Sequence, residues 1–234
     1  MRRLLHVGRG RAEAALSDFV YELGDEASSI RYVCSDMWRP YLKVIQQLLG
    51  EAVHVLDRFH IVANLNKALD QVRATEAKEL AKDGFDSLKH TKYCFLKNPE
   101  NLTPKQKLKL QEVLKPGLKS VRAYLLKKSF QLLWRYESVY WARWYLKKWC
   151  ARAARSRLEP IKKFVKTVRR HEELILNYFV AKKQFSSGVV EGMNRKINLI
   201  TRKSYGFRSE EVRKIALFHT LGQLPEPELA HQFC

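Results

Sequence analysis

The sequence predicts an α/β fold in which a small parallel sheet with crossover helices is interrupted by a large all-helical insertion. Short apolar segments alternate with amphipathic ones over the first sixty residues, and from residue 61 onward the hydrophobic period is almost wholly helical. The composition, with 46% hydrophobic residues and 44 Lys and Arg against 24 Asp and Glu, indicates a globular and strongly basic protein.

The first sixty residues predict the order β-α-β-α-β. Short apolar strands joined through helices imply parallel pairing with right-handed crossovers, and functional groups lie at the carboxyl ends of such strands. Asp36 and Asp57 occupy two of these ends. The expected strands are Leu4–Val7, Ile30–Cys34 and Ala52–Leu56, and the expected helices are Ala12–Leu23 and Pro40–Leu49.

The rest of the chain predicts helices without strands. Thr103 before Pro104, and the segment from Ser156 to Pro160, carry N-cap signals that mark two helix starts. The sequence shows no internal repeat. The expected helices are 61–82, 104–115, 118–133, 139–154, 161–179, 189–203 and 209–221.

The positive charge indicates a polyanionic partner. The net charge is +20, and the segment 118–170 alone holds sixteen Lys and Arg against two acids. Such an excess attracts nucleic acid, although a run of charge is ordinarily a solvated face. Four widely spaced cysteines indicate neither a zinc site nor a disulfide framework, and no segment approaches a membrane span. We therefore expect a soluble, cytoplasmic, nucleoid-associated protein.

The same segment is rich in aromatic residues, for which two roles remain open. Aromatic rings interleaved with cations stack on unpaired bases. However, positions 134, 141, 145 and 149 recur close to the helical period, which is typical of a buried stripe. We favour core packing for most of them and nucleotide contact for one or two at the rim. The residues are Trp134, Tyr136, Tyr140, Trp141, Trp144, Tyr145 and Trp149.

Glu191 is an isolated acid on a predicted amphipathic helix. Helical geometry places it in a polar arc with Asn194, Arg195, Asn198 and Arg202, opposite an apolar arc that docks. A glutamate on such a face is ordinarily solvated. Glycines on both sides of it permit close approach of a phosphate or metal, which favours a functional role.

Three blocks of sequence, in order, resemble the insertion-sequence transposases of the ISL3 family. The first runs from Cys34 to Tyr41, and the second joins Val55–His60 to Asn64–Asp70. The third joins Val190–Ile197 to Tyr205–Arg208. The resemblance spans nearly the whole chain.

The resemblance implies a ribonuclease-H-like core with an Asp-Asp-Glu triad and Mg²⁺ or Mn²⁺. It identifies Asp36 as the second acid and Glu191 as the third, both as catalytic residues and as metal ligands. Asp57 is a less favoured substitute ligand, since an aspartate there is a favoured helix cap. The implied domains are residues 1–62, the start of the core; 63–180, the basic helical insertion; 181–224, the core helices with Glu191; and 225–234, a tail.

The first aspartate of the triad has no counterpart in this chain. We therefore expect the amino-terminal strands of the core to be missing and the isolated chain to be poorly stable and inactive. The expected partners are double-stranded DNA at element ends, target DNA and further copies of the chain. The alternatives are a non-catalytic nucleic-acid-binding protein and a basic helical scaffold. Expected DNA contacts are Arg58, His60, Arg143, Lys147, Lys148, Arg152, Asn194, Arg195, Lys196, Arg202, Lys203 and Arg208.

Overall fold

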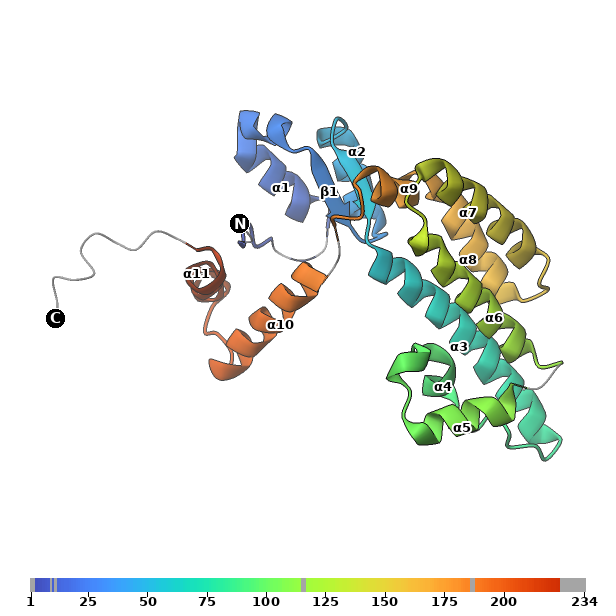
Figure 1. Cartoon of the computed structure of the whole chain (residues 1–234). Helices are drawn as coiled ribbons and strands as arrows, with labels where there is room; N and C mark the ends of the chain where they lie inside the picture. The colour runs from blue at the N-terminus through green and yellow to red at the C-terminus, as the bar shows by residue number, and fades with distance from the viewer. Residues whose placement is uncertain (1–2, 9, 11, 115–116, 186–187, 224–234) are drawn as a thin grey trace. The chain divides into compact units, whose positions relative to one another are not determined.

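The computed structural model describes residues 3–8, 10, 12–114, 117–185 and 188–223, without the side chains of residues 188–191. Within these ranges it has many helices and one two-stranded sheet (Figure 1). The elements fall into two compact units. Tyr32–Met37 with Val53–Phe185 form one, called here the helical unit, and Met1–Arg31, Trp38–Ala52 and Ser186–Cys234 form the other, called the terminal unit.

The sheet of the helical unit pairs β1 (Tyr32–Ser35) and β2 (Val53–Leu56) in parallel. Val55 and Leu56 are almost fully buried, and α9 (Glu172–Val180) packs against β2. The side-chain amide of Asn177 on α9 donates to the backbone oxygen of His54 over 2.9 Å. Residues far apart in sequence therefore fix the strand that precedes Asp57.

The long helix α3 (Arg58–Lys82) contacts three other helices of this unit: α4 (Lys92–Leu96), α6 (Lys119–Gln131) and α8 (Glu159–Arg170) (Figure 1). The remaining elements are η2 (Pro99–Asn101), α5 (Pro104–Val113), η3 (Leu132–Arg135) and α7 (Val139–Ala154). Phe130, Trp149 and Phe164 form an aromatic core between α6, α7 and α8, with ring centroids 4.7 to 6.0 Å apart.

The described residues of the terminal unit form two pairs of α-helices. The first pair is α1 (Ala14–Leu23) and α2 (Arg39–Leu48), which contact each other, with η1 (Gly24–Ser29) after α1. Lys43 of α2 donates to Glu13 just before α1 over 2.9 Å. The second pair is α10 (Gly188–Lys203) and α11 (Glu210–Leu221).

Local signals predicted several of these boundaries. The helix 139–154 has the predicted limits, and Thr103 caps α5 through a capping box with Gln106. Ser209 likewise caps α11. Both predicted strands that precede the aspartates are present within two residues of their expected limits. The coarse α/β class is therefore confirmed.

Three details of the sequence prediction are wrong. Leu4–Val7 is not a strand; Leu4 instead donates its backbone N–H to Leu221 over 2.9 Å, at the end of α11. The predicted helix 161–179 is broken at His171 into α8 and α9, with Glu172 and Glu173 in the first turn of α9. Acids are favourable at a helix N-terminus, so the break needs no glycine or proline. The N-cap of α8 is Leu158, not Ser156.

The aromatic prediction holds only in part. Trp134 and Trp149 are buried, but Trp141, Trp144 and Tyr140 are exposed. Trp141 fitted the helical period of the buried stripe, but it lies outside the buried face of α7, which Ala142, Leu146 and Trp149 form. Among the helices that the structure describes, none is both long enough and apolar enough to cross a bilayer.

Candidate active site and nucleic-acid interface

The two strand-end aspartates meet at one edge of the sheet. The register pairs Ser35 with Leu56, and the backbone N–H of Asp57 donates to the carbonyl oxygen of Ser35 over 2.8 Å. Asp36, the next residue after Ser35, therefore lies beside Asp57. This is the edge at which parallel sheets place their functional groups.

Asp57 acts as the cap of α3. Its Oδ1 accepts the backbone N–H of Phe59 over 2.9 Å, and its Oδ2 lies 3.5 Å from Nε2 of His60. The residue is only 7% exposed. Both carboxylate oxygens are thus engaged within the first turn of α3, which confirms the cap. A metal-binding role for Asp57 remains a prediction.

A buried histidine orders the backbone at Asp36. Ser35 Oγ donates to the Asp36 carbonyl oxygen over 2.9 Å and lies 2.8 Å from His54 Nε2. Because the single hydroxyl proton is used toward Asp36, Nε2 must carry the proton of the bond between His54 and Ser35. Burial, with a smaller contribution from His171, lowers the pKa of His54 to about 4. The lowered pKa keeps His54 neutral at physiological pH, and a neutral imidazole with its proton on Nε2 is compatible with this hydrogen-bond pattern.

Ser35, His54 and Asn177 were missed by the sequence prediction. The available signal was a lone histidine inside the apolar strand Val53–Leu56. A polar side chain at such a position needs a buried partner.

Glu191 lies near the start of α10, and its side chain is outside the described residues. Asp36 belongs to the helical unit and Glu191 to the terminal unit. Their pairing around a metal therefore remains a prediction. Among the side chains that the structure describes, no three His, Cys, Asp or Glu gather as a metal site. The hard carboxylate oxygens of Asp36 and Glu191 are the donors that Mg²⁺ and Mn²⁺ prefer.

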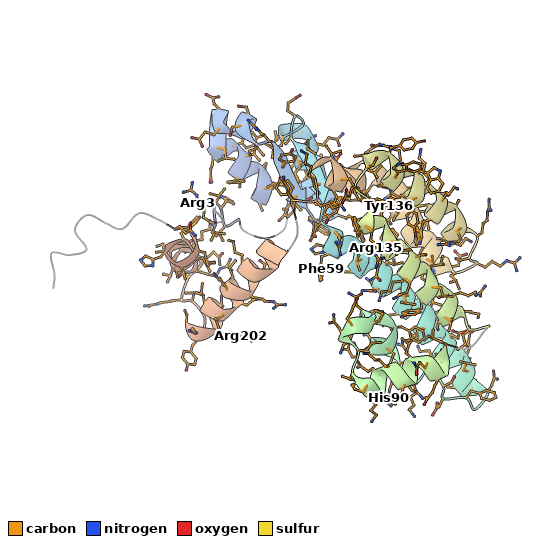
Figure 2. The ribbon with its side chains drawn as sticks, viewed as in Figure 1. Arg3, Phe59, His90, Arg135, Tyr136 and Arg202 are labelled. Atoms are coloured by element: carbon orange, nitrogen blue, oxygen red, sulfur yellow. The ribbon has the colours of Figure 1, made fainter. Side chains whose placement is uncertain are left out.

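The described part of α10 has the predicted two faces. Met193, Ile197 and Ile200 are half-buried. Figure 2 shows Arg202 near the carboxyl end of this helix. The predicted DNA contacts in this region are all exposed: Asn194, Arg195, Lys196, Arg202, Lys203 and Arg208.

Exposed groups also surround the first turn of α3. Phe59 (Figure 2) and His60 are exposed, and the guanidinium of Arg58 lies 5.5 Å from the centroid of the Trp134 ring. This cation–π contact joins the residue after Asp57 to η3. The predicted DNA contacts Arg58 and His60 are therefore next to the sheet edge that carries Asp36.

The four predicted DNA contacts on α7 differ in their surroundings. Arg143 donates to both oxygens of Glu173 and lies 3.5 Å from Glu172, while Lys147 lies 3.9 Å from Glu172. The hydrogen bonds from Arg143 hold the pKa of Glu173 below its usual value. These two cations are compensated by acids. Lys148 instead lies over the Trp144 ring, and Lys148, Arg152 and Arg155 line one groove.

Comparisons with known proteins agree on one family. The model of the ISL3 family of DDE transposases, described as "Transposase", matches residues 1–216. The transposase for insertion sequence element IS1001 from Bordetella parapertussis is 29% identical over 214 residues, which cover 90% of this chain and 52% of that protein. The transposase for IS1557 from Mycobacterium tuberculosis, strain CDC 1551 / Oshkosh, is 29% identical over 236 residues, covering 89% and 52%.

The chain thus spans about half the length of these relatives. No solved structure matches it. Because the family model covers nearly all of the 234 residues, the chain belongs to the ISL3 family of transposases.

Proposed function

We propose that this protein carries two of the three catalytic acids of an insertion-sequence transposase, an enzyme that cleaves DNA at the ends of its element and joins those ends to target DNA. The supporting observation is the position of Asp36, beside the carboxyl ends of two parallel strands in a chain of the ISL3 family. The two strands would then belong to a ribonuclease-H-like core, and the helices between β2 and α10 to an insertion within it.

In this proposal Asp36 and Glu191 hold divalent metal, Mg²⁺ or Mn²⁺. The metal would activate a water or a 3′-hydroxyl for attack and stabilise the leaving oxygen. The chain's own contribution is positional. Ser35 and His54 fix the backbone that presents Asp36, and the cations of α7 and α10 bind the phosphates that flank the scissile bond.

We further propose that the 234-residue chain does not cleave DNA by itself. The family resemblance provides two acids of the triad in this chain and no first aspartate. Asp57 does not supply the third carboxylate in this proposal, since both of its oxygens are engaged at the start of α3.

A non-catalytic DNA-binding protein is the second candidate. Its supporting observation is the group of exposed cations Lys148, Arg152 and Arg155, which line a groove without an acid among its described lining residues. The two candidates differ in their need for divalent metal, because only the transposase requires Asp36 and Glu191 to bind a metal ion.

The test measures binding and cleavage on one labelled duplex that carries the terminal sequence of the element. We expect the chain to bind this duplex with an affinity that falls steeply with salt, and to leave it uncut in Mg²⁺. Asp36→Asn and Glu191→Gln should bind equally well. Cleavage by the wild-type chain that Asp36→Asn abolishes would contradict the proposed inactivity and support the catalytic role. Absence of affinity would contradict both candidates.

A further inference from the structure

The exposed side of α7 carries three aromatic rings that are not buried in the protein core. Tyr140, Trp141 and Trp144 are 68%, 51% and 42% exposed. The Tyr140 and Trp141 rings are 5.2 Å apart, and the Trp141 and Trp144 rings 5.9 Å, both edge to face. The three rings therefore form one continuous surface, called here the α7 aromatic face.

Cations border this face. Lys148 Nζ lies 3.8 Å from the centroid of the Trp144 ring. Trp144 and Lys148 also line a groove of about 600 Å³ together with Leu132, Arg152 and Arg155. Among the described residues that line the groove there is no acid. Its volume lies within the roughly 300–1,000 Å³ that is usual for ligand sites.

The chemistry of the α7 aromatic face selects one kind of occupant. Three adjacent cations disfavour a second copy of the chain as the occupant. In a two-fold interface Lys148, Arg152 and Arg155 of one copy would face the same cations of the other copy and repel them. The three cations favour a polyanion. The adjacent exposed rings favour, in addition, a ligand with flat apolar surfaces. Paired DNA supplies phosphates but keeps its base faces stacked inside the duplex. Unpaired nucleotides supply both phosphates and exposed base faces.

We propose that the α7 aromatic face binds unpaired nucleotides of a DNA strand, stacking bases on Trp141 and Trp144 while Lys148, Arg152 and Arg155 contact the phosphates. Sequence-tolerant binding follows, because every base has a face that stacks on an aromatic ring. The inference rests on the proposed function only in taking DNA as the ligand. Such a site would hold a strand separated from its complement near a cleavage or joining point.

The test compares binding of a labelled oligothymidine strand and of a duplex of equal length, by fluorescence anisotropy, with the 234-residue chain and without divalent metal. Trp144→Ala and Trp141→Ala should each weaken binding of the single strand by about tenfold, the effect of losing one stacking ring. Duplex binding should change less than about twofold. The salt dependence of single-strand binding should stay the same, since no charge is removed.

Tyr93→Ala is the matched control. Tyr93 is 58% exposed and has Lys97 5.8 Å from its ring, so it reproduces an exposed aromatic beside a lysine elsewhere in the helical unit. Its loss should leave both affinities unchanged. Trp144→Phe, which keeps a stacking ring, should restore most of the single-strand affinity and so separates stacking from a folding defect.

Two results would overturn the inference. One is a folded Trp144→Ala variant with unchanged single-strand affinity. The other is equal weakening on single strand and duplex. A change in sedimentation of Trp144→Ala with unchanged DNA binding would identify the face as a contact between copies instead. The proposed function fails separately, if Asp36 and Glu191 bind no metal while the stacking result holds.

Discussion

Replacing Glu76 tests how the helical unit is held together. Glu76 lies on α3 and is only 6% exposed. Its carboxylate accepts the backbone N–H groups of Lys119 and Ser120 over 2.6 and 2.7 Å, as well as the Ser120 hydroxyl. The N-cap residue of α6, Leu118, makes no side-chain cap. Glu76 therefore caps α6 from a different helix.

The expected cost of Glu76→Ala follows from these contacts. A buried donor left without its acceptor costs roughly 1–3 kcal/mol, and bonds to a charged group are at the upper end. Glu76 satisfies two backbone donors and also opposes the positive end of the helix dipole. The lost hydrogen bonds share one carboxylate, so their contributions are not simply added. We expect Glu76→Ala to lower the free energy of unfolding by about 3–4 kcal/mol, a large part of the roughly 5–15 kcal/mol stability of a domain.

The assay is urea unfolding followed by far-UV circular dichroism. Glu76→Gln should lower the free energy of unfolding less than Glu76→Ala, because the glutamine amide oxygen still accepts one of the two N–H groups. Glu79→Ala is the control: Glu79 is on the same helix, accepts from Lys119 Nζ over 2.8 Å and is half-exposed. It should cost at most about 1 kcal/mol. If Glu76→Ala lowers the free energy of unfolding no more than Glu79→Ala does, Glu76 does not stabilise the start of α6.

Two further predictions concern charge. The unfolded state binds a proton on His54 near pH 6.5, while burial and His171 lower the folded-state pKa to about 4. Unfolding free energy should therefore rise by roughly 3 kcal/mol from pH 4 to pH 6.5, and urea titrations of His54→Gln should lack this rise. Arg152→Gln should make the slope of log binding constant against log salt concentration, measured with duplex DNA, shallower by about one. Arg143→Gln should change this slope less in the same titration, because Glu173 already compensates the charge of Arg143.

Features encoded in a few neighbouring residues were predictable. Thr103, Pro104 and Gln106 specify a capping box within four residues, and the apolar runs before Asp36 and Asp57 specify short strands. Parallel pairing then brings the two aspartates to one edge, as the sequence predicted.

Features that depend on distant partners were not predictable. The segment Leu4–Val7 has strand-like composition, but a strand needs a neighbour, and Leu4 bonds to the end of α11 instead. Glu76 and Ser120 are 44 residues apart, so nothing local marks the cap. The helical period grouped Trp141 with Trp149, although only packing decides which ring is covered. The catalytic and metal-binding role of Glu191 remains a prediction, since its side chain lies outside the described residues.

The proposed transposase site requires Asp36 and Glu191 to hold the same divalent metal. The most direct test is Mn²⁺ binding, measured by electron paramagnetic resonance on the wild-type chain, Asp36→Asn, Glu191→Gln and the double variant. If the two carboxylates share an ion, each single change should weaken binding by about tenfold or more, and the double change should be clearly non-additive. Unchanged Mn²⁺ affinity in either single variant, or losses that simply add, would contradict it.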